Sequence, residues 1–203
     1  MNELIAELKR EGVLKNPNIL RAFQGIDRKD FVPEALWDEA YGNYPLPLGN
    51  SGQTISQPYT VAFMLDLLSP ETGEKILDVG SGSGWTTALL ASVVGLTGKV
   101  YGVEIIPELV ALGQKNLAKY DFRNASIRQA GEKLGIPEEA PFDKILVSAA
   151  GSSLSHELLS QLKTGGILVM PIENYISRVK KISADKIETE KFEGFAFVPL
   201  VKN

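Results

Sequence analysis

Apolar residues follow two different periods along the chain. From Leu4 to Phe23 they recur with helical spacing, and from residue 57 onward short apolar runs alternate with helical patterns. The expected elements are a helix over 59–68, a strand over 75–80, a helix over 85–94, a strand over 99–105, a helix over 107–120, strands over 125–130 and 142–150, a helix over 155–162 and a strand over 166–172. Because the strands are apolar on both faces and alternate with helices, we predict an α/β fold with a mostly parallel sheet flanked by helices.

The two ends of the chain differ from this alternation. Residues 31–50 are interrupted by prolines and glycines and cannot form one regular element. We therefore expect residues 1–56 to form an N-terminal helical cap with a covering loop, and residues 57–203 to form the α/β core of a single domain. Residues 175–200 alternate between apolar and polar, which predicts a C-terminal antiparallel strand pair with a turn near Asp185.

Composition narrows the possible functions. The 203 residues are 44% hydrophobic, enough for a sizeable core, and 21 basic against 25 acidic residues give a net charge of -4. No basic excess points to nucleic acid, so we expect no such partner. With no cysteine and a single histidine, His156, we also expect no metal site. The charged opening and the lack of any apolar run near ~20 residues predict no membrane contact and a soluble, cytoplasmic protein, which we expect to be a monomer.

Candidate chemistry starts at the loop between the strand over 75–80 and the following helix. Gly80, Gly82 and Gly84 occupy this loop. Strand, glycine loop and helix together are typical of a nucleotide-binding site. A dinucleotide fingerprint would need a glycine where Trp85 stands, and an acid, Asp78, precedes the first glycine by two residues. The loop therefore fits a dinucleotide poorly.

A second acid specifies the ligand further. Glu104 follows Gly84 by twenty residues and ends the next strand, a position from which a carboxylate can accept both ribose hydroxyls of an adenosine. Asp78 adds negative charge where a dinucleotide would place its pyrophosphate, which favours a ligand with an ammonium and a sulfonium group. We therefore predict S-adenosyl-L-methionine as the cofactor. The alternative is that the glycines only build a tight turn and the acids are solvated.

Motifs along nearly the whole chain resemble one family. They are "GVLKNPNILRAFQGIDRKDFVP" at 12–33, "GQTISQP" at 52–58, "LDVGSGSG" at 77–84, "VEIIPEL" at 103–109, "EEAPFDKILVSAA" at 138–150, "LLSQLKTGGILVMPI" at 158–172 and "FVPL" at 197–200. In this order they resemble the protein-L-isoaspartate O-methyltransferases, which implies a Rossmann-like class I methyltransferase fold. The resemblance also implies the reaction: methylation of the alpha-carboxylate of isoaspartyl residues in damaged proteins and peptides, followed by collapse of the ester to a succinimide.

The resemblance implies a role for each residue of the "TISQP" motif. Ser56 would be the active-site serine, and Thr54 and Ile55 would lie along the cofactor. The expected cofactor-binding residues are Thr54, Ile55, Asp78, Gly80, Ser81, Gly82, Glu104, Ile105, Gly131 and Glu132. The alternative for Thr54 and Ser56 is that they cap the helix that starts near Tyr59.

The sequence departs from the family pattern at three places. Ala130, Gly131 and Glu132 stand where the family has "G-D-G", so the acid is displaced by one residue. Two residues, Asn50 and Ser51, separate the glycines before "QTISQP", so the covering loop is longer. Residues 148–153 contain a glycine, Gly151, where the family turn has a proline, so we expect a more flexible turn. A silent S-adenosylmethionine-binding homologue and a methyltransferase for another acceptor, such as RNA, therefore remain as alternatives.

Overall fold

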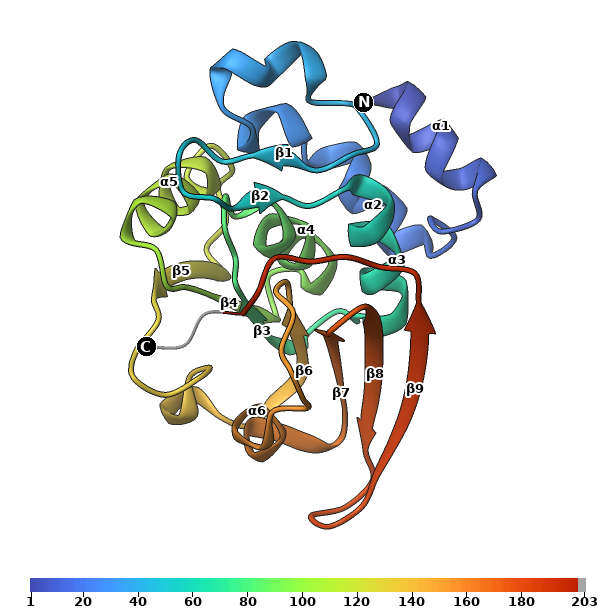
Figure 1. Cartoon of the computed structure of the whole chain (residues 1–203), viewed down its shortest axis with the longest axis vertical. Helices are drawn as coiled ribbons and strands as arrows, with labels where there is room; N and C mark the ends of the chain where they lie inside the picture. The colour runs from blue at the N-terminus through green and yellow to red at the C-terminus, as the bar shows by residue number, and fades with distance from the viewer. Residues whose placement is uncertain (201–203) are drawn as a thin grey trace.

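A seven-stranded sheet forms the centre of the computed structural model, which describes residues 1–200 (Figure 1). The strands are β3 (Lys75–Val79), β4 (Lys99–Glu104), β5 (Ala125–Gln129), β6 (Phe142–Val147), β7 (Leu162–Ile172), β8 (Tyr175–Lys181) and β9 (Ile187–Glu193). Their order is β5-β4-β3-β6-β7-β8-β9. The first five strands in this order are parallel, and β8 and β9 continue the sheet in antiparallel pairing. The predicted fold class is confirmed.

Helices flank the sheet, and the first two helices belong to the N-terminal cap. They are α1 (Asn2–Arg10), α2 (Pro17–Gly25), α3 (Pro58–Leu68), α4 (Trp85–Val94), α5 (Pro107–Leu117) and α6 (His156–Gln161), with 3-10 turns η1 (Arg28–Phe31), η2 (Glu34–Glu39) and η3 (Pro137–Glu139). Three helices begin with a proline, whose fixed φ suits the first turn and whose missing N–H costs nothing there. The Asn16 side chain caps α2 by accepting the N–H of Asn18. Glycines at both ends delimit α4.

The two faces of the sheet pack against different layers. Ile76 and Val100 join the larger core, which contains the buried residues of α1 to α5, whereas Leu77 and Val79 join a second core with Leu158 of α6. Alternate residues of a strand point to opposite faces. The face under α4 therefore receives Ile76 and, two residues later, Asp78.

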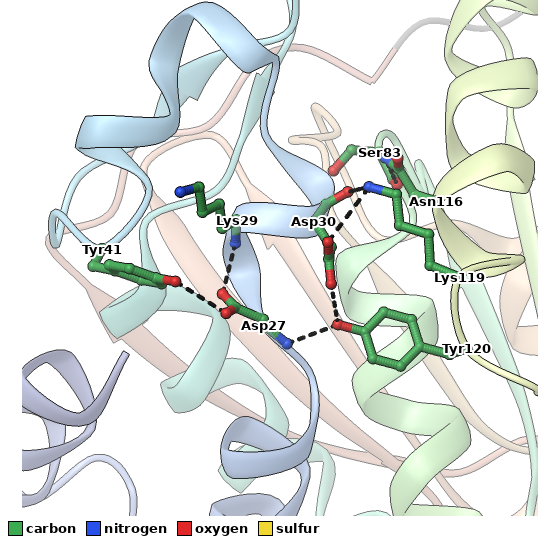
Figure 2. A network of polar contacts seen from close by, with 8 residues as sticks. All are labelled: Asp27, Lys29, Asp30, Tyr41, Ser83, Asn116, Lys119 and Tyr120. Carbon is green, nitrogen blue, oxygen red and sulfur yellow. Dashed lines mark hydrogen bonds and ion pairs between the residues drawn. The ribbon is translucent and has the colours of Figure 1, made fainter.

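A short β-ribbon and a polar network attach the cap to the core. Strands β1 (Leu46–Pro47) and β2 (Thr54–Ile55) pair antiparallel and lead into α3. Beside α5, the Tyr120 hydroxyl accepts the N–H of Asp27 at 2.9 Å and donates to the carboxylate of Asp30 at 2.7 Å, as Figure 2 shows. Tyr41 donates to the Asp27 carboxylate at 2.9 Å. The start of η1 is thus fixed against the end of the α5 segment.

Three element boundaries differ from the predicted ones by three residues or more. Strand β6 ends at Val147 and not at 150. Strand β7 begins at Leu162 and not at 166, because Leu162 already pairs with Phe142 of β6. Helix α5 ends at Leu117 and not at 120. The antiparallel pair in the tail is confirmed, with the turn between β8 and β9 at 182–186. Residues 201–203, the end of the predicted core, lie outside the described residues.

Candidate active site

A cavity of about 270 Å³ opens at the carboxyl ends of β3, β4 and β6. Its walls come from separate parts of the chain: cap residues 53–56, the glycine loop at 79–83, residues 103–106 after β4, residues 130–135 after β5, and residues 198–200 of the tail. In an open parallel sheet this edge is where ligands bind, because the connections diverge there. The sequence-predicted residues therefore meet in one place, with the exception of Asp78.

The glycine loop has the conformations that only glycine adopts readily. Gly80, Gly82 and Gly84 have φ of 76°, 52° and 89°. A Cβ on Gly84 would lie 2.9 Å from Ile127, so the loop also needs glycine for close packing against β5. The hydroxyls of Ser81 and Ser83 are buried and have no hydrogen-bond partner within residues 1–200. The loop thus brings two unsatisfied polar groups to the cavity wall, where a polar ligand would satisfy them.

Glu104 lies at the cavity wall, as predicted, with most of its acceptor capacity already used. One carboxylate oxygen accepts the N–H of Ile105 at 2.7 Å and of Ile106 at 3.0 Å, and the other accepts the N–H of Gly82 at 2.9 Å. A carboxylate has about four acceptor sites. Glu104 therefore ties the end of β4 to the glycine loop and has about one site left for a ligand hydroxyl.

Asp78 differs from the expectation because it is not among the residues that line the cavity. It is fully buried, and one carboxylate oxygen accepts the hydroxyls of Thr86 at 2.9 Å and Thr87 at 2.6 Å. Burial raises the pKa of Asp78 from 3.8 to about 6, while the two threonine bonds oppose this shift. Since Thr86 does line the cavity, Asp78 faces the site through Thr86 rather than directly.

Ser56 contributes to the cavity wall and does not cap a helix. Helix α3 has Gln57 as its N-cap residue without a side-chain cap bond, and the N–H of Tyr59 is instead accepted by Asn43 at 3.0 Å. In the described part of the chain, no group hydrogen-bonds to the hydroxyl of Ser56 or of Thr54. The capping alternative is therefore not what the structure shows, and the Ser56 hydroxyl remains available to a ligand.

Residues Gly131 and Glu132 follow β5 and line the same cavity. Glu132 is exposed, so its carboxylate can swing on its side chain. A Cβ on Gly131 would have no atom within 4 Å, so space for a side chain exists there. The displaced acid thus stays beside the cavity.

The longer covering loop is an ordered hairpin connection. Ser51 donates from its hydroxyl to the Leu48 carbonyl at 2.7 Å and accepts the N–H of Gln53 at 3.2 Å. The N–H of Leu48 in turn donates to the Gln53 carbonyl at 2.8 Å. The additional residue therefore tightens the connection between β1 and β2.

The turn that contains Gly151 holds the tail over the cavity. The Gly151 N–H donates to Pro171 at 3.1 Å, and its carbonyl accepts from Glu173 at 3.0 Å. The N–H of Ala150 donates to Val198 and its carbonyl accepts from Leu200, both at 2.8 Å. Because both polar groups of Gly151 are bonded, the turn is better fixed than expected, and a proline there would lose the bond to Pro171.

Three further features of residues 1–200 concern His156, metal ligands and membrane spans. His156 is exposed at the start of α6 and is not a cavity-lining residue. Among residues 1–200 no cluster of histidine, aspartate or glutamate has the arrangement of a metal site. No helix in that range is long and apolar enough to cross a membrane.

Sequence reasoning missed two parts of the site. The tail residues 198–200 form one wall, although "FVPL" was only part of a resemblance. Arg28 lies behind Ser56 and donates to its carbonyl at 3.1 Å. Arg28 begins an "R-x-x-FVP" stretch that resembles the family, but this pattern does not indicate that the side chain is buried or that its partners are backbone carbonyls.

Comparisons with known proteins agree with each other. The family model described as Protein-L-isoaspartate(D-aspartate) O-methyltransferase matches residues 1–203. A protein-L-isoaspartate O-methyltransferase of Ignicoccus hospitalis is 40% identical, over 98% of this chain and 96% of its own length. One of Myxococcus xanthus is 46% identical over 81% of this chain and 76% of its own length. A Plasmodium falciparum protein described as a putative protein-L-isoaspartate O-methyltransferase, solved with S-adenosyl-L-homocysteine, is 26% identical, with a TM-score of 0.86 over 99% of this chain and 98% of that one.

Proposed function

This chain belongs to the protein-L-isoaspartate(D-aspartate) O-methyltransferase family, and we propose that its cavity methylates the alpha-carboxylate of isoaspartyl residues with Ser56 as the group that orients the acceptor. The family assignment covers the whole chain and makes S-adenosyl-L-methionine the cofactor. Several of the side chains that line the cavity can be given a part in that reaction.

The residues at the cavity fit this cofactor. Ser81 and Ser83 offer buried hydroxyls without partners among residues 1–200, and Glu104 keeps about one acceptor site for a ribose hydroxyl. The rest of the predicted cofactor-binding residues on the cavity wall are Thr54, Ile55, Gly80, Gly82, Ile105, Gly131 and Glu132. Bound there, the cofactor supplies a methyl group on a positively charged sulfur. The buried carboxylate of Asp78, behind Thr86, adds negative charge on the same side.

The acceptor needs positioning more than activation. A carboxylate has an ordinary pKa near 4, so it is ionised at neutral pH and needs no general base. The available Ser56 hydroxyl can donate a hydrogen bond to one of its oxygens and aim the other. Residues 53–56 and tail residues 198–200 line the cavity, and their closure over bound ligands would exclude water. Exclusion of water favours a reaction that converts an anion and a cation into neutral products.

One observation carries the proposal. The Ser56 hydroxyl, which no group within residues 1–200 binds, lines the same cavity as the glycine loop and Glu104. A silent binding protein needs no such hydroxyl opposite its cofactor site. Transfer to a carboxylate does, because orientation supplies much of the rate.

The test is a comparison of acceptors. Purified protein and labelled S-adenosyl-L-methionine are incubated with an isoaspartyl peptide, its aspartyl twin and an RNA. We expect label only on the isoaspartyl peptide, because only that linkage places a free alpha-carboxylate on a branch of the chain. Equal labelling of both peptides, or labelling of RNA, would reject the acceptor, and cofactor binding without any transfer would favour the silent homologue.

Location, assembly and domain organisation complete the proposal. We propose that the protein works in the cytoplasm, as a monomer, and as a single domain in which residues 1–56 cover the cofactor and acceptor sites. The packing of cap helices α1 and α2 into the same core as α3 and α4 supports the single domain. Light scattering of the purified protein tests the monomer.

A further inference from the structure

Arg28 is a buried cation at the junction of cap and core. It begins η1 and is 0% exposed. Its two terminal nitrogens donate to four backbone carbonyls, those of Ala40 at 2.9 Å, Gly42 at 3.1 Å, Tyr44 at 3.0 Å and Ser56 at 3.1 Å. The planar fork of a guanidinium can make four such bonds at once, which an ammonium group cannot.

These bonds hold two turns of the chain together. Three of the carbonyls belong to the turn at 40–44, and the fourth belongs to the turn that joins β2 to α3. Asn43 reinforces the same junction, since its carbonyl accepts from Gln57 at 2.9 Å and its side chain accepts the N–H of Tyr59 at 3.0 Å. The backbone on both sides of Ser56 is therefore fixed to the cap.

Arg28 also contacts the glycine-loop side of the cavity. Its guanidinium carbon lies 5.4 Å from the ring centroid of Trp85, the first residue of α4 and a cavity-lining residue. One side chain thus touches the turn that bears Ser56 and the helix that follows the glycine loop. Arg28 therefore bridges the acceptor side and the cofactor side of the cavity.

No carboxylate within residues 1–200 forms an ion pair with Arg28, so carbonyl dipoles and the indole face hold its charge. Burial lowers the pKa of Arg28 from its ordinary value to about 10. The side chain therefore stays protonated at neutral pH. A positive charge without a counterion in the described chain lies close to the place proposed for an anionic acceptor.

We propose that Arg28 is a positioning residue that fixes the Ser56 turn against α4, and so aims the Ser56 hydroxyl at the acceptor carboxylate. This inference rests on the proposed function. It assigns Arg28 no contact with the substrate and no part in proton transfer.

The experiment is a double-mutant cycle between Arg28→Lys and Ser56→Ala. If Arg28 acts through Ser56, Arg28→Lys alone lowers kcat for the isoaspartyl peptide by about tenfold, since small misplacements of a reacting group cost this much or more. In the Ser56→Ala background the same change then has little further effect. A purely structural role would give additive losses. Arg28→Gln is measured in parallel. A higher KM for the peptide in Arg28→Gln than in Arg28→Lys would show that the positive charge at position 28 contributes to peptide binding.

Arg178→Lys is the matched control. Arg178 also donates to a backbone carbonyl, that of Leu67 at 2.9 Å, but it lies on β8 away from the cavity lining. We expect this variant to keep kcat and KM whatever its stability. Cofactor affinity, measured by calorimetry, should stay near that of the unmodified protein in both Arg28 variants.

Amide hydrogen exchange separates this proposal from the proposed function. Faster exchange at 54–59 in Arg28→Lys, with no such change in Arg178→Lys, supports the role of Arg28 in fixing the Ser56 turn, even if the acceptor proves to be different. Additive losses in the cycle, unchanged exchange at 54–59, or failure of both Arg28 variants to fold would overturn the proposal. In the last case Arg28 is a folding residue only.

Discussion

Replacing Glu104 by glutamine tests the junction between β4 and the glycine loop. The glutamine oxygen can still accept from Ile105 and Ile106, but its amide nitrogen then faces the N–H of Gly82, and two donors cannot bond. A donor left without a partner costs about 1–3 kcal/mol. We therefore expect Glu104→Gln to lower the free energy of unfolding by about this amount.

Cofactor affinity should fall in the same variant. The last acceptor site of Glu104 would make a charge-assisted hydrogen bond of about 1.5–3 kcal/mol with a ribose hydroxyl, which corresponds to roughly 10- to 100-fold in the dissociation constant. Urea unfolding and calorimetry with S-adenosyl-L-methionine measure the two effects separately. Glu108→Gln, which removes an exposed acid from the first turn of α5, controls for net charge.

Each measurement can refute its own part of the reasoning. An unchanged urea midpoint in Glu104→Gln would mean that the bond to Gly82 contributes nothing in solution. A lower midpoint with an unchanged dissociation constant would leave Glu104 as a structural link and remove its role toward the ribose. Equal effects in Glu108→Gln would mean that the loss of stability and the loss of cofactor affinity both come from the change in net charge.

Three more variants test the remaining assignments. The raised pKa of Asp78, about 6, means that the folded state binds a proton more tightly than the unfolded state, so its stability falls as pH rises from about 4 to 7. Asp78→Asn should remove this loss. In urea titrations, the free energy of unfolding of the variant minus that of the unmodified protein should rise by roughly 3 kcal/mol across that pH range. A difference that does not change with pH would contradict the prediction. Ser56→Ala should lower kcat about tenfold with cofactor affinity intact, and the pH–rate profile should show no limb near pH 7; a rate that follows a group titrating near neutrality would point to a base. Glu132→Ala should weaken cofactor binding up to about tenfold and Gly131→Asp should change it little, and the reverse result would show that the displaced acid does not reach the adenine.

Most of the sheet could be predicted because buried parallel strands are short apolar runs between helices. The order of the last two strands, β8 and β9, could not, since hydrophobicity alone does not choose which of them pairs with β7. The start of β7 was placed too late because Lys163 to Gly165 are exposed and interrupt the apolar run. The strand is irregular there, with Gly165 at a φ of 84° and a register shift against β6. The division of the domain at residue 56 remains a prediction.

The candidate site divides in the same way. Glycine spacing and the end of β4 led to the loop and Glu104, and both line the cavity, because both positions follow from chain geometry. Their role in binding the cofactor remains a prediction. Asp78 was placed on the cavity wall, although the alternation of β3 puts it on the face of Ile76, under α4. Strand period was thus the available signal, and the expected ligand charge was given too much weight.

The hydrogen bonds that Arg28 and Asn43 make around Ser56 affect which substitutions the cap can tolerate. Arg28 and Asn43 bind main-chain groups, and every amino acid offers the same carbonyl. Substitutions at the exposed Tyr44 therefore leave one acceptor of Arg28 in place, whereas no other side chain reproduces its fork of donors. In a saturation library we expect position 28 to tolerate almost nothing while Tyr44, an exposed residue, accepts many replacements, so the least variable residue of the cap would be one whose partners leave no trace in the sequence.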